Sequence, residues 1–267
     1  MQNEYLYYVD EWIIALVLVI ILAIFFELGY FLGFKRHVRK GGKDEDIGAI
    51  QGGILGLLGI MFAFTFSMAA SRFDSRKLAI LKESNAIGTT YLRVSLLPDS
   101  IKPEIYALLE KYVDYRLMYD RTTDRNKMST IIDSSEIVQL KIWRMASNNA
   151  VLNNNWNSSL FLSTLNEMID LSAERYAVQL NHVPEIILYL MILLSTISTF
   201  TLGFGCGLEN NRKFIFSYSL IFLIILVFMV IIDLDRPLRG VIRVGDKSLL
   251  DLDNSIEKFS PLKSDGR

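Results

Sequence analysis

Few residues of this 267-residue chain have the side chains and the spacing that catalysis requires. One cysteine, Cys206, and two histidines, His37 and His182, exclude a disulfide framework and any multi-cysteine or histidine-rich metal centre. We find no nucleophile–base pair and no glycine loop that would hold a phosphate. An enzyme would have to assemble carboxylates alone, such as Glu83 and Asp170, around a divalent metal. The sequence therefore predicts a protein that is not an enzyme and that holds no cofactor or metal.

Charged residues are more informative as a network than as a reaction centre. Arg72, Arg76 and Glu83 are spaced by four and seven residues, so they share one face of a helix. We interpret that face as a solvated surface or as the site of salt bridges between subunits. Asp233 or Asp235 is expected to pair with an arginine in a turn at the membrane surface. The other candidates for a charged network are Arg93, Asp170, Asp233, Asp235 and Arg236.

The elements that must position these residues belong to a membrane protein. Hydrophobic residues make up 51% of the chain and the mean hydropathy is +0.31, which is too apolar for a soluble domain of this size. Four apolar runs are long enough to cross about 30 Å of hydrocarbon as helices. We assign the spans to residues 12–34, 47–70, 183–205 and 214–232. The net charge of -1 gives no argument for a nucleic-acid partner.

The second span has small residues at steps of three or four, which lets a neighbouring helix approach closely. Helix packing is the favoured role of this stripe, and pore lining is the alternative. Phe62 and Phe66, one turn apart on another face, are candidates for a hydrophobic constriction, unless they contact lipid or core. Gln51 near the entrance and Ser67 further along are polar candidates for the pore. The small residues are Gly48, Gly52, Gly56, Gly59 and Ala63.

No proline occurs between residues 48 and 93, so the second helix is expected to continue from the membrane into water. Residues 71–182 are then a helical extramembrane domain, with a loop at 121–133 and a new helix opened by Ser135 and Glu136. In the tail, residues 233–267, a short strand is expected at 241–244 and the end is expected to fray. The predicted fold class is an all-α membrane protein with four transmembrane helices.

Several blocks of sequence resemble one family. The residues LLGIMFAFTFSMAASRFDSRK and ESNAIGTTYLR, the pattern LN-xx-ID at 165–170, HVPE at 182–185 and DLDRPLRG at 233–240 are similar to bestrophin-like membrane proteins of bacteria. The resemblance runs from about Ala23 to Leu252. It implies a distant similarity to bestrophins, which are pentameric anion channels with a cytosolic helical domain on an extended second helix. Side chains of that helix form a narrow neck in bestrophins, and Phe62 and Phe66 are the nearest candidates here.

Two functions remain open from the sequence. The first is an oligomeric ion channel with a pore lined by the second span, and the second is a non-conducting membrane protein whose helical domain senses or recruits a partner. The expected partners are the lipid bilayer of a bacterial inner (plasma) membrane and further copies of the chain. The lysines and arginines of the loops at 35–46 and 209–213 favour an external position for the termini and the central domain, whereas the resemblance implies a cytosolic one.

Overall fold

The computed structural model describes residues 9–39, 47–152, 156–236, 242 and 244–259, and all regular elements of this part of the chain are helices. The expected all-α fold class is confirmed. Contacts divide the chain into a membrane unit, residues 1–72 with 182–236, and a helical unit, residues 73–181 with most of the tail from 243 onward. The helices are α1 (Glu11–Arg39), α2 (Gly48–Arg93), the short 3-10 helix η2 (Val94–Leu96), α3 (Lys102–Arg121), α4 (Arg125–Leu152), α5 (Trp156–Gln179), α6 (Glu185–Leu208), α7 (Phe214–Asp235) and α8 (Lys247–Phe259).

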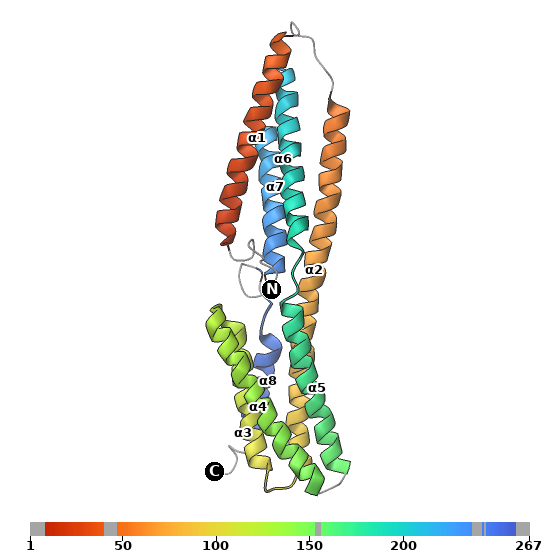
Figure 1. Ribbon diagram of the computed structural model, residues 1–267, viewed down its shortest axis with the longest axis vertical. Coiled ribbons are helices and arrows are strands. Elements are labelled where there is room, and N and C mark those ends of the chain that lie inside the picture. Colours follow the sequence, from red (N-terminus) through yellow and green to blue (C-terminus); the bar gives the residue numbers. More distant parts are fainter. Residues whose placement is uncertain (1–8, 40–46, 153–155, 237–241, 243, 260–267) are drawn as a thin grey trace. The chain divides into compact units, whose positions relative to one another are not determined.

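Four helices, α1, α2, α6 and α7, are long and apolar enough to cross a membrane. In the membrane unit α1, α6 and α7 run side by side (Figure 1). Glycines explain how closely α1 and α6 approach each other. A Cβ atom added to Gly29 would overlap the carbonyl oxygen of Phe200, and one added to Gly203 would overlap that of Phe26. Backbone therefore packs directly on backbone, as small residues permit between transmembrane helices.

Helix α2 confirms the expected long second helix. It spans 46 residues without a break, which corresponds to about 70 Å at 1.5 Å per residue. That length is roughly twice the thickness of the hydrocarbon layer. The boundary between the two units falls within this helix, between Arg72 and Phe73. The apolar first half is thus part of the membrane unit, and the charged second half is part of the helical unit.

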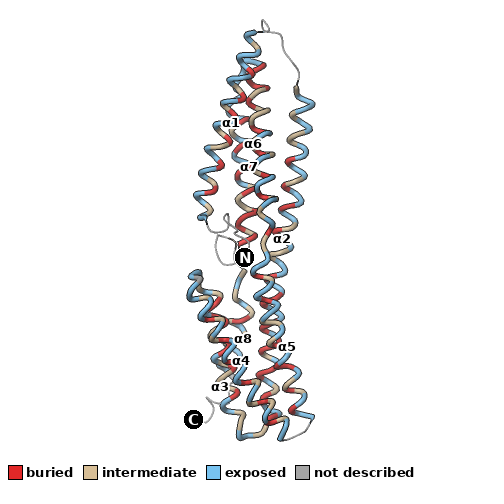
Figure 2. The backbone as a smooth tube through the Cα atoms, in the orientation of Figure 1, coloured by how far each residue is buried: buried red, intermediate tan, exposed pale blue. Residues whose placement is uncertain are grey.

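The helical unit has a continuous apolar core between α3, α4, α5, α8 and the second half of α2. Buried residues line the inner faces of these helices in Figure 2. The most deeply buried apolar side chains include Ile87, Ile105, Ile142 and Phe161. Buried positions recur at helical spacing, as in Ile105, Leu109 and Tyr112 of α3, so one side of the helix faces the core.

The loop expected at residues 121–133 is wrong, because only residues 122–124 separate α3 from α4. The Asp124 side chain explains the early start of α4. It accepts hydrogen bonds from the backbone N–H groups of Asn126 at 2.9 Å and Lys127 at 3.4 Å. An aspartate at this position satisfies N–H groups that the first turn leaves unpaired. Ser135, expected to open the helix, instead lies within it and donates to the Ile132 carbonyl at 2.8 Å.

Residues 247–259 of the tail form helix α8, which the sequence analysis did not predict, and the terminus that was expected to fray lies outside the described residues. Leu249 and Ile256 are buried in the core of the helical unit, seven residues apart on one face of α8. The Ser84 hydroxyl of α2 donates to the Ser248 carbonyl at 2.8 Å, and this bond fixes the start of α8. The strand expected at 241–244 falls mostly outside the described residues.

Candidate functional site: the second helix and the network around Glu83

The membrane half of α2 packs less tightly than the other three spans. Only 17% of its most apolar window is buried within the chain, against 28–33% for the corresponding windows of α1, α6 and α7. The small residues expected to pack all lie on the exposed side, and no atom comes within 4 Å of a Cβ added to Gly52, Gly56 or Gly59. Gly48, Ala63 and Ser67 are exposed as well. Gly52, Gly56 and Gly59 are thus not covered by any described residue of the same chain.

Phe62 and Phe66, which the sequence pairs as a constriction, have different surroundings. The Phe62 side chain is 9% exposed and belongs to the apolar core of the membrane unit, together with Leu58 and Ala69. Phe66 is 44% exposed. Ile60 and Phe64 are also exposed, and sequence reasoning did not select them. The sequence does not tell which side of α2 the chain itself buries. Ile60 and Phe64 could therefore be recognised as exposed only once the helices that pack on α2 were known.

Gln51 connects α2 to α6 within the membrane unit. Its side-chain amide donates to the Thr201 carbonyl at 2.6 Å. Gly205 makes room for this amide, because a Cβ atom at that position would overlap the Gln51 nitrogen. The side chain also borders a cavity of about 230 Å³ that Cys206 and Ser217 line. Gln51 is therefore held by a helix of its own chain.

The charged face of α2 is buried in the helical unit, so the expectation of a solvated face is wrong for Arg76 and Glu83. Arg76 is 1% exposed and donates to the Asn181 carbonyl at 2.8 Å. Glu83 is completely buried. Arg72 lies in the membrane unit and is partly exposed. Arg93, near the end of the helix, donates to the Leu160 carbonyl at 3.1 Å.

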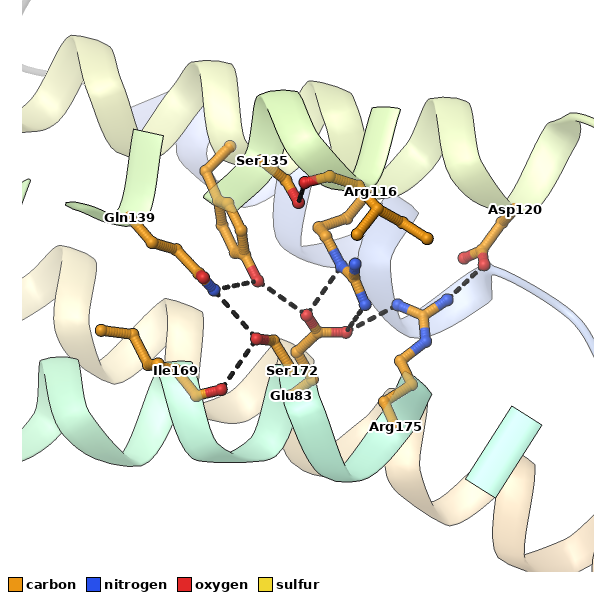
Figure 3. A network of polar contacts seen from close by, with 10 residues as sticks. Glu83, Arg116, Asp120, Ser135, Gln139, Ile169, Ser172 and Arg175 are labelled. Atoms are coloured by element: carbon orange, nitrogen blue, oxygen red, sulfur yellow. Dashed lines mark hydrogen bonds and ion pairs between the residues drawn. The ribbon is translucent and has the colours of Figure 1, made fainter. Parts of the chain in front are cut away.

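Glu83 is the centre of a buried network that three helices complete (Figure 3). Its carboxylate pairs with Arg116 of α3 at 2.7 Å and with Arg175 of α5 at 2.6 Å. The Tyr112 hydroxyl donates to the same carboxylate at 2.9 Å. Arg175 also pairs with Asp120, so two guanidinium groups face two carboxylates. The charges of the cluster therefore cancel, which a buried ionic group needs.

Neutral side chains extend the network away from the charges. The Gln139 amide of α4 donates to the Tyr112 hydroxyl at 3.0 Å and to the Ser172 hydroxyl at 2.9 Å. Ser172 in turn donates to the Ile169 carbonyl at 2.8 Å, as Figure 3 shows. Helices α2, α3, α4 and α5 thus meet at one hydrogen-bonded centre. A buried polar network of this kind specifies how the helices pack.

The two carboxylates of the cluster are perturbed in opposite directions. Burial alone would raise the pKa of Glu83, but the charges and hydrogen bonds of Arg116 and Arg175 outweigh it and hold that pKa below its ordinary value. Burial raises the pKa of Asp120 above its ordinary value, although Arg175 and Arg116 oppose the shift. Burial and the nearby Glu83 charge also raise the pKa of Tyr112. Glu83 is therefore the ionised acceptor of the network.

The carboxylate site that an enzyme would need is not assembled. Asp170 is exposed, whereas Glu83 is enclosed by arginines. Among the described residues, no group of three or more histidine, cysteine or acidic side chains has the geometry to hold a metal ion.

At the end of α7, Asp235, Arg236 and His182 join segments of the membrane unit. The Asp235 carboxylate accepts from the Val183 N–H at 2.7 Å, and His182 contacts the Asp235 carbonyl at 3.0 Å through Nδ1. Arg236 donates to the Val9 carbonyl at 2.7 Å and pairs with Glu11 at 3.5 Å. Asp233 accepts from the Ile242 N–H at 2.8 Å. An arginine–carboxylate pair was expected here, and the carboxylate that Arg236 reaches is Glu11.

Comparison with known proteins identifies the family of this helical assembly. The family model named Bestrophin-like domain matches residues 20–249, which is most of the chain. The chain belongs to the Bestrophin-like family. A comparison with curated protein sequences finds no match.

Solved structures share the fold of this Bestrophin-like chain. A bacterial bestrophin homologue from Klebsiella pneumoniae is 13% identical, with a TM-score of 0.66 over 88% of this chain and 98% of that chain. A single-substitution variant of that homologue gives 14% identity and a TM-score of 0.67 over 94% and 99% of the two chains. At this identity the likeness concerns the fold.

The network around Glu83 contains residues that the sequence analysis did not select. Tyr112, Arg116, Asp120 and Arg175 were not selected, because each looks like an ordinary polar position on its own helix. One signal was available: Tyr112, Arg116 and Asp120 are four residues apart and so lie on one face of α3, whose neighbouring positions are apolar. A polar stripe within the apolar face of a helix indicates buried polar partners.

Proposed function

We propose that this membrane protein is an oligomeric ion channel in which the membrane half of α2 lines the pore. The observation that carries the proposal is the uncovered stripe of α2. Small residues let helices approach closely, and no other described helix of the chain covers them. Copies of α2 around an axis would cover the stripe and enclose a path. The bestrophins that the sequence resembles suggest anions as the transported class and five as the number of subunits.

Phe66 is the proposed constriction, because its ring is available to an axis and the Phe62 ring is packed in the protomer. Exposed apolar side chains at a narrow point restrict ion flow by expelling water. Planar bilayers containing purified protein should carry an ion current, and Phe66→Ala should increase its conductance. Phe62→Ala is the matched control and should lower protein stability without changing conductance. Absence of current across a range of voltage and pH would refute the channel.

The oligomer is tested separately at the stripe. Gly56→Leu places a large side chain where the chain itself has open space. We expect this variant to fold as a protomer and to lose the oligomer, as measured by mass photometry in detergent. An unchanged oligomer would mean that the stripe is not the contact between subunits.

A second candidate function is recruitment of a protein partner by the helical unit. Val151 and Leu152 end α4, Trp156 begins α5, and each side chain is at least 75% exposed. Large apolar side chains in such an exposed group are typical of interaction sites. Crosslinking from position 152 should repeatedly capture one specific protein if this function holds. If crosslinking captures no specific protein and the purified protein conducts ions, the channel is the function that remains supported.

The protein is proposed to lie in the bacterial inner membrane with the central domain outside. The short loops after α1 and α6 carry the lysines and arginines that usually stay in the cytoplasm. A cysteine placed at Thr123, in a Cys206→Ser background, should then react with an impermeant reagent added to intact cells. Reaction only after lysis would instead support the cytosolic orientation that the resemblance to bestrophins implies.

A further inference from the structure

Five cationic side chains gather at one end of the membrane unit, and we call this group the basic end. Lys35, Arg36 and Arg39 occupy the last two turns of α1, and Arg212 and Lys213 lie in the turn between α6 and α7. All five are exposed. Lys35 and Arg39 make no ion pair with any residue that the structure describes.

Contacts between α1 and the α6–α7 turn bring the two parts of the basic end together. The Arg212 guanidinium lies 4.5 Å from the centre of the Tyr30 ring and 3.6 Å from the Glu27 carboxylate. Lys35 follows Tyr30 by five residues on α1, which is about 8 Å along the helix axis. The turn between α6 and α7 therefore packs against α1 within about two turns of the cations of α1.

The carboxylates at this end leave an excess of positive charge. Arg212 pairs with Glu27, and Lys213 pairs with Glu209 at 2.5 Å. All four of these side chains are 42–54% exposed, and exposed pairs of this kind are weak enough to be exchanged for another anion. Residues 40–46 add two lysines and three acidic residues to the sequence, so the end as a whole stays net positive.

Aromatic rings locate the basic end at the depth of lipid headgroups. Tyr30 stacks with Phe34 at 6.3 Å, and Phe214 contacts Tyr218 with ring centres 4.3 Å apart. Aromatic side chains at the ends of transmembrane helices mark the interface between hydrocarbon and water. Cations just beyond such rings lie at the level of phosphate groups and not in bulk water.

We propose that the basic end binds the headgroups of anionic phospholipids. Clustered lysines and arginines next to a transmembrane helix attract anionic lipid. The phosphate groups would contact Lys35 and Arg39, which lie one turn apart on α1, while the acyl chains lie along the exposed side chain of Phe31, one turn before Lys35. The occupant is a lipid and not a soluble anion, because apolar surface for the acyl chains adjoins the cations. This inference does not depend on ion conduction.

The test compares two lipids with identical acyl chains on the full-length protein in detergent. Native mass spectrometry would measure the apparent Kd of dioleoyl-phosphatidylglycerol and of dioleoyl-phosphatidylcholine. We expect tighter binding of phosphatidylglycerol, and we expect the triple variant Lys35→Gln, Arg36→Gln, Arg39→Gln to weaken it by about tenfold or more, since each cation near a membrane surface contributes about fivefold. Raising the salt concentration to about 1 M should produce a similar loss, because screening then acts over about 3 Å.

The matched control removes three exposed cations from the helical unit, by Lys127→Gln, Lys141→Gln and Arg144→Gln. It changes the net charge equally and should leave the Kd for phosphatidylglycerol unaltered. Equal binding of the two lipids, an equal loss in the control, or full competition by inorganic phosphate at the same concentration would each overturn the proposal. An unchanged melting temperature and an unchanged Kd for phosphatidylcholine would show that the triple variant remains folded. If the variant misfolds, the salt dependence of phosphatidylglycerol binding to the wild-type protein decides the proposal.

Discussion

Replacing Glu83 with glutamine should destabilise the helical unit by several kcal/mol. The Glu83 carboxylate is completely buried and accepts hydrogen bonds from Tyr112, Arg116 and Arg175 at 2.6–3.1 Å. Glutamine keeps the shape of the side chain but removes its charge, which leaves two buried guanidinium groups with Asp120 as their only nearby carboxylate in the described network. Loss of one partner from a buried ion pair typically costs about 3–5 kcal/mol.

The expected shift in melting temperature can be measured in the full-length protein with a probe that reports on the helical unit. Trp143 packs against the core of this unit, so its fluorescence reports local unfolding when Trp12 and Trp156 are replaced by phenylalanine. A domain of this size loses about 3 °C of melting temperature per kcal/mol. We therefore expect Glu83→Gln to lower the melting temperature by about 10 °C in detergent.

Lys82→Gln is the matched control because it breaks an ion pair one residue away on the same helix. Lys82 pairs with Glu174 at 3.2 Å, and both side chains are nearly half exposed. Exposed pairs contribute less than about 1 kcal/mol, so this variant should shift the melting temperature by less than about 3 °C. Equal shifts in the two variants would refute the view that the Glu83 network holds the unit together.

Three further predictions concern the same network and the membrane unit. Asp120→Asn should cost less stability than Glu83→Gln in the Trp143 assay, because Asp120 pairs with one arginine, Arg175, whereas Glu83 pairs with both Arg116 and Arg175; an equal loss would contradict this. The pKa of Glu83 is lowered in the folded protein, so its contribution is present above the unfolded value of about 4.3 and is lost as the pH falls below it. Melting curves between pH 7 and pH 3 should show this loss, and Glu83→Gln should reduce it. Gly29→Ala should destabilise the membrane unit by about 1–3 kcal/mol, because the added Cβ meets the Phe200 carbonyl. Gly53→Ala is the control, because its Cβ meets open space. Trp12 fluorescence on heating should show a lower melting temperature for Gly29→Ala than for Gly53→Ala.

The spans and the long second helix could be predicted from the sequence because they depend on local composition. An apolar run of sufficient length must cross the membrane as a helix, since its backbone groups have no other partners there. The absence of proline from 48 to 93 likewise allowed one continuous helix. These inferences require no knowledge of which helices pack together.

The charged face of α2 could not be interpreted in the same way. The spacing of Arg76 and Glu83 places them on one side of the helix, but spacing does not tell whether that side meets water or protein. The answer depends on Arg116 and Arg175, which lie 33 and 92 residues further along the chain than Glu83. Helix α8 was missed although its apolar residues, such as Leu249 and Ile256, recur on one face, because the stretch has only 13 residues and follows a proline-containing segment.

Helix α2 has two kinds of surface: positions that its own chain buries, and positions that its own chain leaves exposed. Phe62, Ala69, Arg76, Glu83 and Thr90 follow one another at intervals of seven residues, and all five are buried. An α-helix drifts by about 20° per seven residues, which is about 80° over these four steps, so each half of α2 has its own buried side. In the membrane half, the small-residue stripe lies beside the buried positions on the helix and is exposed. Substitutions on the buried register should therefore change protomer stability, and substitutions on the stripe should change assembly. A single variant that changed both would show that the two faces are not independent.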